Sequence, residues 1–94
     1  MTTQLGERIR SLRTQRGLLL RQVASALEMD TALLSKIERG ERPVKKEQVS
    51  LIAEILNADK EELLTLWLAT QVLDVLKNEQ LALRALNLVQ MELI

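Results

Sequence analysis

Four basic residues near the middle of the chain are the side chains best suited to bind an anion. They lie within eight positions and are Arg39, Arg42, Lys45 and Lys46. Guanidinium and ammonium groups donate hydrogen bonds to anionic oxygens, and phosphate is a common partner. A helix is predicted to begin at about residue 45, and the free backbone N–H groups of its first turn add to this attraction. The segment therefore favours phosphate contact, with a charged, solvated surface as the alternative.

Two short helices joined by a tight turn are predicted just before this basic segment. Asp30 is a suitable N-cap for the second helix, and Gly40 can end that helix in the left-handed conformation. Apolar residues recur at helical spacing on the inner face of the two helices, at Val23, Ala24, Leu27, Leu34 and Ile37. With polar side chains left on the outer face of the second helix, this pattern is typical of a helix-turn-helix. Arg21, at the start of the first of the two helices, is a further candidate for phosphate contact.

The same stretch resembles the lambda-repressor-like family, also called Cro/repressor or XRE regulators. The residues that carry the resemblance are Gly17-Leu18, Val23-Ala24 and the run Leu34-Ser35-Lys36-Ile37-Glu38-Arg39-Gly40-Glu41-Arg42-Pro43. The similarity covers roughly residues 5–66. It implies a protein that binds operator DNA as a dimer, with the second helix of the motif in the major groove.

By their position on that helix, four residues match those that reach base edges in the family, namely Thr31, Ala32, Ser35 and Lys36. Lys36 can donate to guanine O6 or N7, Thr31 and Ser35 can bond a base or a phosphate, and Ala32 can meet a thymine methyl. The alternative is a solvated polar face.

Two departures from the family pattern affect the DNA contact. Leu19 and Leu20 stand where the family usually has Ser or Thr followed by Gln, so a cap and a phosphate contact are expected to be missing. Glu28 stands where the turn commonly has Gly, and a non-glycine residue with positive φ costs energy. Arg13 and Glu38 resemble a partly buried ion pair of the family, with a structural role.

The composition predicts an all-α fold. Hydrophobic residues make up 47% of the chain and aromatic residues 1%, with three Gly and one Pro, and no alternating strand pattern is present. We predict six helices in a lambda-repressor-like helix-turn-helix bundle of four to five helices with a C-terminal extension. The first is expected from about Gln4 to Gln15, with Gly17 ending it. The fourth is expected from about Lys45 to Leu56, and its inward residues are Val49, Ile52, Ala53 and Leu56. The helix-turn-helix domain is expected over residues 1–58 and a helical dimerisation extension over residues 59–94. Asp59 and Glu62 are predicted to form a capping box.

Two helices are predicted in the extension. The first ends near Lys77-Asn78 and the second begins at about Glu79, and both carry apolar residues on more than one face. A monomer of this size cannot cover such a surface, so homodimerisation is the simplest expectation. The residues assigned to the dimer interface are Trp67, Leu68, Val72, Leu76, Leu83, Leu86 and Val89. For Trp67 the alternative is ordinary core packing within one chain.

The formal net charge is zero, but its distribution is uneven. Residues 1–58 hold ten basic and seven acidic side chains, whereas residues 59–94 hold three and six. The positive half is the half with the helix-turn-helix, and the local field governs attraction to phosphate. The absence of Cys and His argues against a disulfide scaffold, a structural zinc site and an enzyme, and no cofactor is expected. No leader or bilayer-spanning run is recognised, so a cytoplasmic protein is expected.

These observations predict a sequence-specific transcriptional regulator that binds a pseudo-palindromic operator in double-stranded DNA as a homodimer. A phage-type repressor or a restriction–modification controller is the favoured type, with no evident small-molecule effector. The alternative is a protein-interaction module or an antitoxin whose helical tail binds a different protein. The loss of polar residues at positions 19 and 20 favours the alternative slightly. The basic side chains disfavour it, and these are Lys36, Arg39, Arg42, Lys45 and Lys46.

Overall fold

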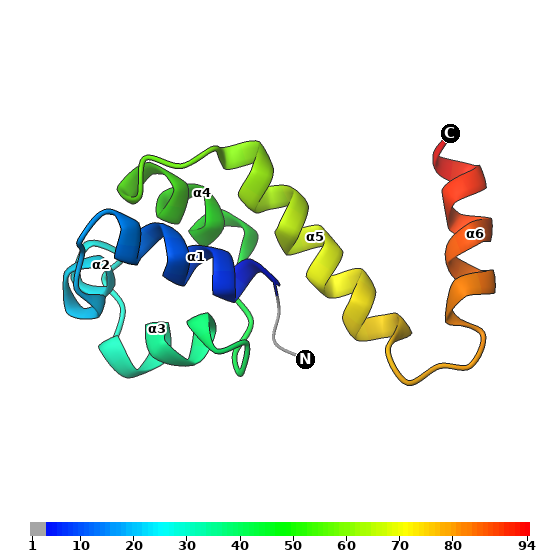
Figure 1. The fold of residues 1–94 in the computed structure, drawn as a ribbon, viewed down its shortest axis with the longest axis horizontal. Coiled ribbons are helices and arrows are strands. Elements are labelled where there is room, and N and C mark those ends of the chain that lie inside the picture. The colour runs from blue at the N-terminus through cyan, green and yellow to red at the C-terminus, as the bar shows by residue number, and fades with distance from the viewer. Residues whose placement is uncertain (1–3) are drawn as a thin grey trace.

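The computed structural model describes residues 4–94, and this part of the chain folds into six α-helices without a strand (Figure 1). The helices are α1 (Gln4–Gln15), α2 (Leu20–Ala26), α3 (Thr31–Glu38), α4 (Lys46–Ile55), α5 (Lys60–Leu76) and α6 (Ala82–Leu93). The all-α prediction is confirmed, and the predicted bounds of α1 are those observed.

The core lies between α1, α2, α3, α4 and the first part of α5. Its aliphatic side chains interlock across these helices, and each fully buried Leu, Ile or Val stabilises the fold by roughly 1.5–3 kcal/mol. The buried apolar residues are Leu5, Ile9, Leu12, Val23, Ala24, Leu34, Ile37, Val44, Val49, Ile52, Ala53, Leu56 and Leu63. The inward positions predicted for α3 and α4 are among them.

The first turns of α5 belong to this core. Leu63 is fully buried, and Leu64, Leu66 and Trp67 pack against the core from its edge. The indole Nε1 of Trp67 donates a hydrogen bond of 2.7 Å to the carbonyl oxygen of Val44. The packed unit therefore runs past the expected boundary at residue 58 and ends inside α5. Trp67, expected in a dimer interface, has its partner within the chain, which is the alternative considered for it.

Glutamine side chains cap two helices whose N-cap residues cannot do so. Leu19 precedes α2, and its backbone N–H donates to the side-chain oxygen of Gln22 at 2.7 Å. Lys45 precedes α4, and its N–H donates to Gln48 at 3.0 Å. Both glutamines hold the third helical position, as in half of a capping box. The expected loss of the cap before α2 is thus partly compensated from within the helix.

The predicted capping box at the start of α5 is only half correct. Asp59 caps the helix as expected, because its carboxylate accepts the N–H of Glu61 at 3.0 Å. Glu62 does not reach back to the N-cap. It forms an ion pair with Arg8 of α1 at 3.2 Å, so it joins two helices instead. The partner that competes with the N-cap is the charged guanidinium of Arg8, 54 positions away in the chain. The local spacing of residues around Asp59 does not reveal this partner.

Left-handed residues end three of the early segments. Gly17 ends α1 at φ 67° and Gly40 follows α3 at φ 77°, as predicted. Glu28, between α2 and α3, takes φ 53° although it is not glycine. The tight turn of the motif is therefore retained, at a local backbone cost of about 1–2 kcal/mol.

Beyond Trp67 the chain leaves the bundle. The second half of α5 projects outward, and α6 stands apart from the helices of the core (Figure 1). Helix α6 begins at Ala82, three residues later than predicted, and none of its residues is buried. Helices long and apolar enough to cross a membrane are not found in residues 4–94.

Candidate DNA-binding surface

Helix α3 presents one polar face away from the core. Leu34, Ile37 and Glu38 are buried on its inner side. Of the four predicted base-reading residues, Thr31, Ala32 and Lys36 are exposed and Ser35 is half-buried. Asp30 caps the helix by accepting the N–H of Ala32 at 3.3 Å. The structure thus brings the four residues onto the accessible side of one short helix, and their contact with bases stays a prediction.

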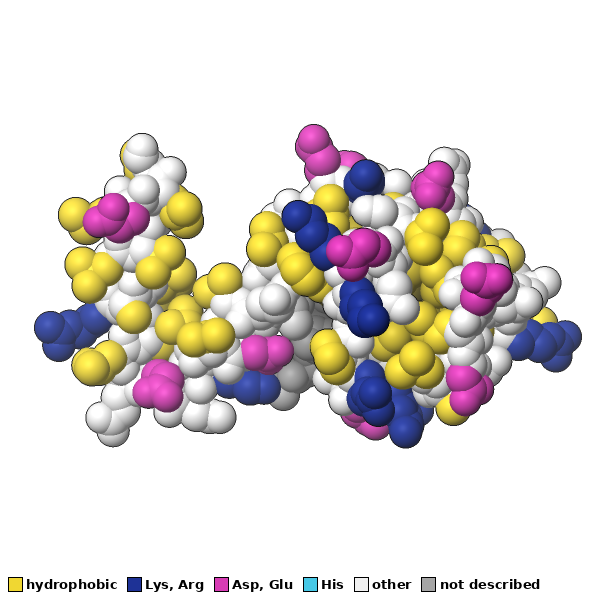
Figure 2. Space-filling view, turned by 180° about the vertical axis from the view of Figure 1, so that it is seen from behind, with side chains coloured by type: hydrophobic (Ala, Val, Ile, Leu, Met, Phe, Trp, Pro, Cys, Tyr) yellow, Lys and Arg dark blue, Asp and Glu magenta, His cyan; other side chains and the backbone are white. Residues whose placement is uncertain are grey.

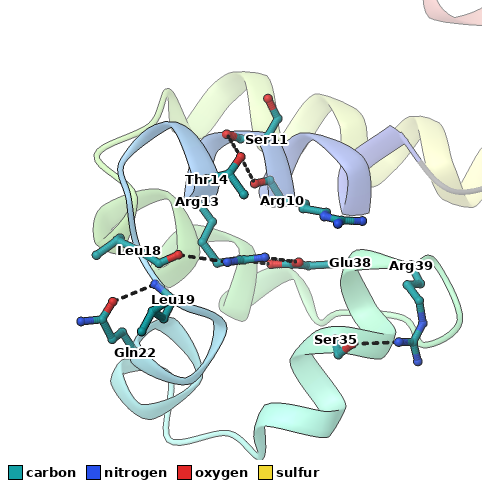
Figure 3. A network of polar contacts seen from close by, with 10 residues as sticks. All are labelled: Arg10, Ser11, Arg13, Thr14, Leu18, Leu19, Gln22, Ser35, Glu38 and Arg39. Carbon is teal, nitrogen blue, oxygen red and sulfur yellow. Dashed lines mark hydrogen bonds and ion pairs between the residues drawn. The ribbon is translucent and has the colours of Figure 1, made fainter.

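An ion pair ties α3 to α1 (Figure 3). The guanidinium of Arg13 meets the carboxylate of Glu38 with two hydrogen bonds, Nε to Oε2 at 2.8 Å and Nη2 to Oε1 at 3.1 Å. Its third nitrogen donates to the carbonyl oxygen of Leu18 at 2.9 Å. The hydrogen bond to Glu38 raises the pKa of Arg13. The predicted structural pair is therefore confirmed, and it fixes the end of α3 against the scaffold.

Arg39, predicted to bind phosphate, has partners within the chain. Its Nη1 donates to the hydroxyl of Ser35 at 2.9 Å (Figure 3). Its Nε donates to Glu41 Oε2 at 2.7 Å, and Nη2 lies 3.4 Å from the other carboxylate oxygen. This pair raises the pKa of Arg39 and lowers that of Glu41. Glu41 was not predicted as a partner of Arg39. The signal for it in the sequence is an acidic residue two positions after an arginine in a tight turn.

The remaining basic candidates are exposed. Arg42, Lys45 and Lys46 follow α3 in the connection to α4 and its first residue, and Arg21 lies in the first turn of α2. Among residues 4–94 these four side chains and Lys36 form no ion pair. Their charges are therefore available to an external anion, and they share the half of the chain that holds α3.

An apolar surface covers α6 and the end of α5 (Figure 2, at the left). On α5, exposed residues at positions 68, 72 and 75 fall on one side, and we name Leu68, Val72 and Val75 the α5 stripe. On α6 the same spacing recurs, and we name Leu86, Val89 and Leu93 the α6 stripe. Spacings of four and three residues are those of a helix–helix packing seam.

The predicted interface residues divide between this surface and its surroundings. Leu68 and Val72 belong to the α5 stripe, and Leu86 and Val89 belong to the α6 stripe. Leu83 is exposed one turn before Leu86 on α6, and Leu76 is half-buried at the end of α5. Val75 and Leu93, 74% and 81% exposed, complete the stripes but were not among the residues selected from the sequence.

The fold and the exposed face of α3 define a helix-turn-helix protein of the DNA-binding class. A family model described as a helix-turn-helix domain matches residues 4–66, and the chain belongs to that family. This range includes the core part of α5, and the match agrees with the resemblance to lambda-repressor-like regulators. No curated protein and no solved structure gives a significant match.

Proposed function

We propose that the protein is a homodimeric, sequence-specific transcriptional regulator that binds a pseudo-palindromic operator. It acts by occupying DNA rather than by catalysis, in the manner of a phage-type repressor or a restriction–modification controller. The observation that carries the proposal is the accessible face of α3, with Thr31, Ala32 and Lys36 exposed beside a half-buried Ser35. A helix of this kind enters the major groove in helix-turn-helix proteins.

In this proposal base contacts and phosphate contacts come from different elements. Lys36 and its neighbours on α3 meet base edges. Arg42 and Lys45 lie in the connection to α4, and Lys46 is the first residue of that helix. Their side chains, which form no ion pair within residues 4–94, bind phosphate and set the register of the protein on the duplex. Arg21 reaches the backbone from the start of α2.

The dimer is built on the α5 and α6 stripes. Their six side chains are between 39% and 81% exposed in the single chain. Burying one partly exposed side chain stabilises the assembly by roughly 1 kcal/mol. Summed over both copies, this free energy is of the same order as the cost of association, which is about 4–15 kcal/mol. A second copy is the favoured occupant because a two-fold protein matches a two-fold operator.

A second candidate function follows from the same apolar surface. If a different protein covers α6, the chain is an interaction module or an antitoxin. The observation in its favour is Leu19, which is 50% exposed at the start of α2, where the family usually has a polar residue that can bind phosphate. Subunit exchange between tagged and untagged chains separates the two, because only self-association gives mixed assemblies.

Selection of bound DNA from a random duplex library, at physiological salt, tests the regulator directly. We expect an enriched pseudo-palindrome with half-site centres about 10 base pairs apart. Weak, salt-sensitive retention without any enriched sequence would contradict sequence-specific regulation and support the interaction module.

A further inference from the structure

The hydroxyl of Ser35 differs from those of three helical threonines in its hydrogen bonds. Thr14, Thr65 and Thr70 each donate to a backbone carbonyl oxygen four residues earlier, at 2.7–3.0 Å. Ser35 has no such acceptor within residues 4–94. Its oxygen instead accepts a hydrogen bond from Arg39 Nη1 at 2.9 Å. The proton of Ser35 is therefore left for a partner outside the chain.

The orientation of Arg39 depends on Glu41. The carboxylate takes the Nε and Nη2 edge of the guanidinium, at 2.7 and 3.4 Å, which leaves Nη1 for Ser35. A guanidinium is planar and carries its five N–H groups in fixed directions, so binding one edge determines where the other points. All three side chains are on or next to the accessible face of α3, and those of Arg39 and Glu41 are 51% and 54% exposed.

A hydroxyl has one donor proton and two acceptor lone pairs. Donation from a cation occupies one lone pair and polarises the O–H bond, which strengthens the hydroxyl as a donor. In the major groove, guanine offers O6 and N7, adenine offers N7 and thymine offers O4 as acceptors, whereas cytosine presents only its N4 amino donor. The lone pair that remains is a poorer acceptor for the cytosine amino group, because the oxygen already accepts from a cation. Ser35 in this arrangement therefore favours guanine, adenine or thymine over cytosine.

We infer that Arg39, held by Glu41, is a positioning residue that presents Ser35 as a hydrogen-bond donor, so that the base facing Ser35 is guanine, adenine or thymine rather than cytosine. This inference rests on the proposed function. It replaces the expectation that Arg39 binds phosphate, and it adds Glu41 to the residues that determine specificity.

The test compares base preferences of the full-length protein and four variants, by selection from a random duplex library followed by competition binding. For the wild-type protein we expect one position of each half-site to be depleted in cytosine by about three- to tenfold, as for one neutral hydrogen bond. Ser35→Ala and Arg39→Lys should both abolish the depletion at that same position. Lysine keeps the charge but lacks the fork that holds Glu41 and Ser35 together. Glu41→Gln should reduce the depletion of cytosine without abolishing it.

Arg42→Ala is the matched control, because its side chain has no contact with Ser35. It should weaken binding to every sequence and leave the base preference unchanged. If Arg39→Lys kept the wild-type preference, or relaxed a position that Ser35→Ala does not affect, the positioning role would be wrong. Absence of any enriched sequence with the wild-type protein would instead overturn the proposed function, so the two failures are distinguishable.

Discussion

Arg13 of α1 and Glu38 of α3 form a two-point ion pair, 25 positions apart in the chain, with N–O distances of 2.8 and 3.1 Å. Their side chains are 13% and 4% exposed. The pair joins the scaffold to the last turn of the helix that faces outward, and Arg13 also holds the carbonyl oxygen of Leu18, just before α2. One arginine thus links α1, the end of α3 and the connection that leads into α2.

Removing one partner of this pair should destabilise the domain strongly. Glu38→Ala leaves the Arg13 charge in a largely buried site without its carboxylate, and we expect a loss of about 3 kcal/mol in the free energy of unfolding. Urea denaturation measures this loss. Lys77→Ala, which removes the exposed ion pair with Asp74, serves as control and should change stability by less than about 1 kcal/mol. Equal effects of the two substitutions would contradict the anchoring role.

Gly6 should tolerate no side chain, because α1 crosses the end of α3 there. A Cβ at this position would lie 2.5 Å from the carbonyl oxygen of Ile37 and 2.7 Å from that of Glu38. We expect Gly6→Ala to lower the free energy of unfolding by about 1–3 kcal/mol. Gly17 is the comparison, since it has open space but φ 67°.

Substitution by asparagine distinguishes steric contact at Gly6 from the left-handed backbone at Gly17, because asparagine adopts the left-handed conformation more readily than alanine. Gly17→Asn should therefore be better tolerated than Gly17→Ala, whereas Gly6→Asn should be at least as damaging as Gly6→Ala. Thermal melting of the four variants checks this order, and rescue at Gly6 by asparagine would rule out the close approach as its cause.

Base and phosphate contacts should respond differently to mutation. Lys36→Ala is expected to cost about 1–3 kcal/mol of binding free energy and to relax the preference at one base pair. Arg42→Ala should weaken binding to all sequences and reduce the slope of affinity against salt by about one. Titrations with specific and scrambled duplexes at several salt concentrations measure both effects. Equal loss on every sequence for both variants would refute this division.

The α6 stripe should be needed for the dimer. Because Trp67 packs on the core, a chain shortened to residues 1–77 keeps the whole bundle and should be folded and monomeric, with weaker DNA binding. In the full chain, Leu86→Glu should dissociate the dimer. Leu88→Glu, at an exposed position on another side of α6, should not. Analytical ultracentrifugation reports the mass, and a dimer of residues 1–77 would move the interface away from α6.

DNA binding should be insensitive to pH near neutrality. The chain has no histidine, and the hydrogen bond from Arg39 holds the pKa of Glu41 below its ordinary value of 4.5. A carboxyl with a lowered pKa contributes its stabilisation above the ordinary value and loses it only as the pH falls through the lowered one. We expect constant affinity between about pH 5.5 and 7 at fixed ionic strength. Fluorescence anisotropy with a labelled duplex measures this, and a transition inside that range would require another titrating group.

The local elements of this protein follow from its sequence alone. Asp30, Gly17 and Gly40 mark helix ends because capping and positive φ involve only a few neighbouring residues, and the helical period of apolar residues identified the inner faces of α3 and α4. The motif from Leu34 to Pro43 also indicated the fold family. Gln22 and Gln48, each three residues after an N-cap, are equally local signals for helix caps.

The tertiary structure decided the choices between competing partners. Glu62 pairs with Arg8 rather than capping α5, and Trp67 donates a hydrogen bond to the carbonyl oxygen of Val44. Each of these side chains had more than one partner within reach of its chemistry, and only the packing of helices distant in sequence selects among them. The same packing leaves α6 uncovered, because the core is already complete at Trp67.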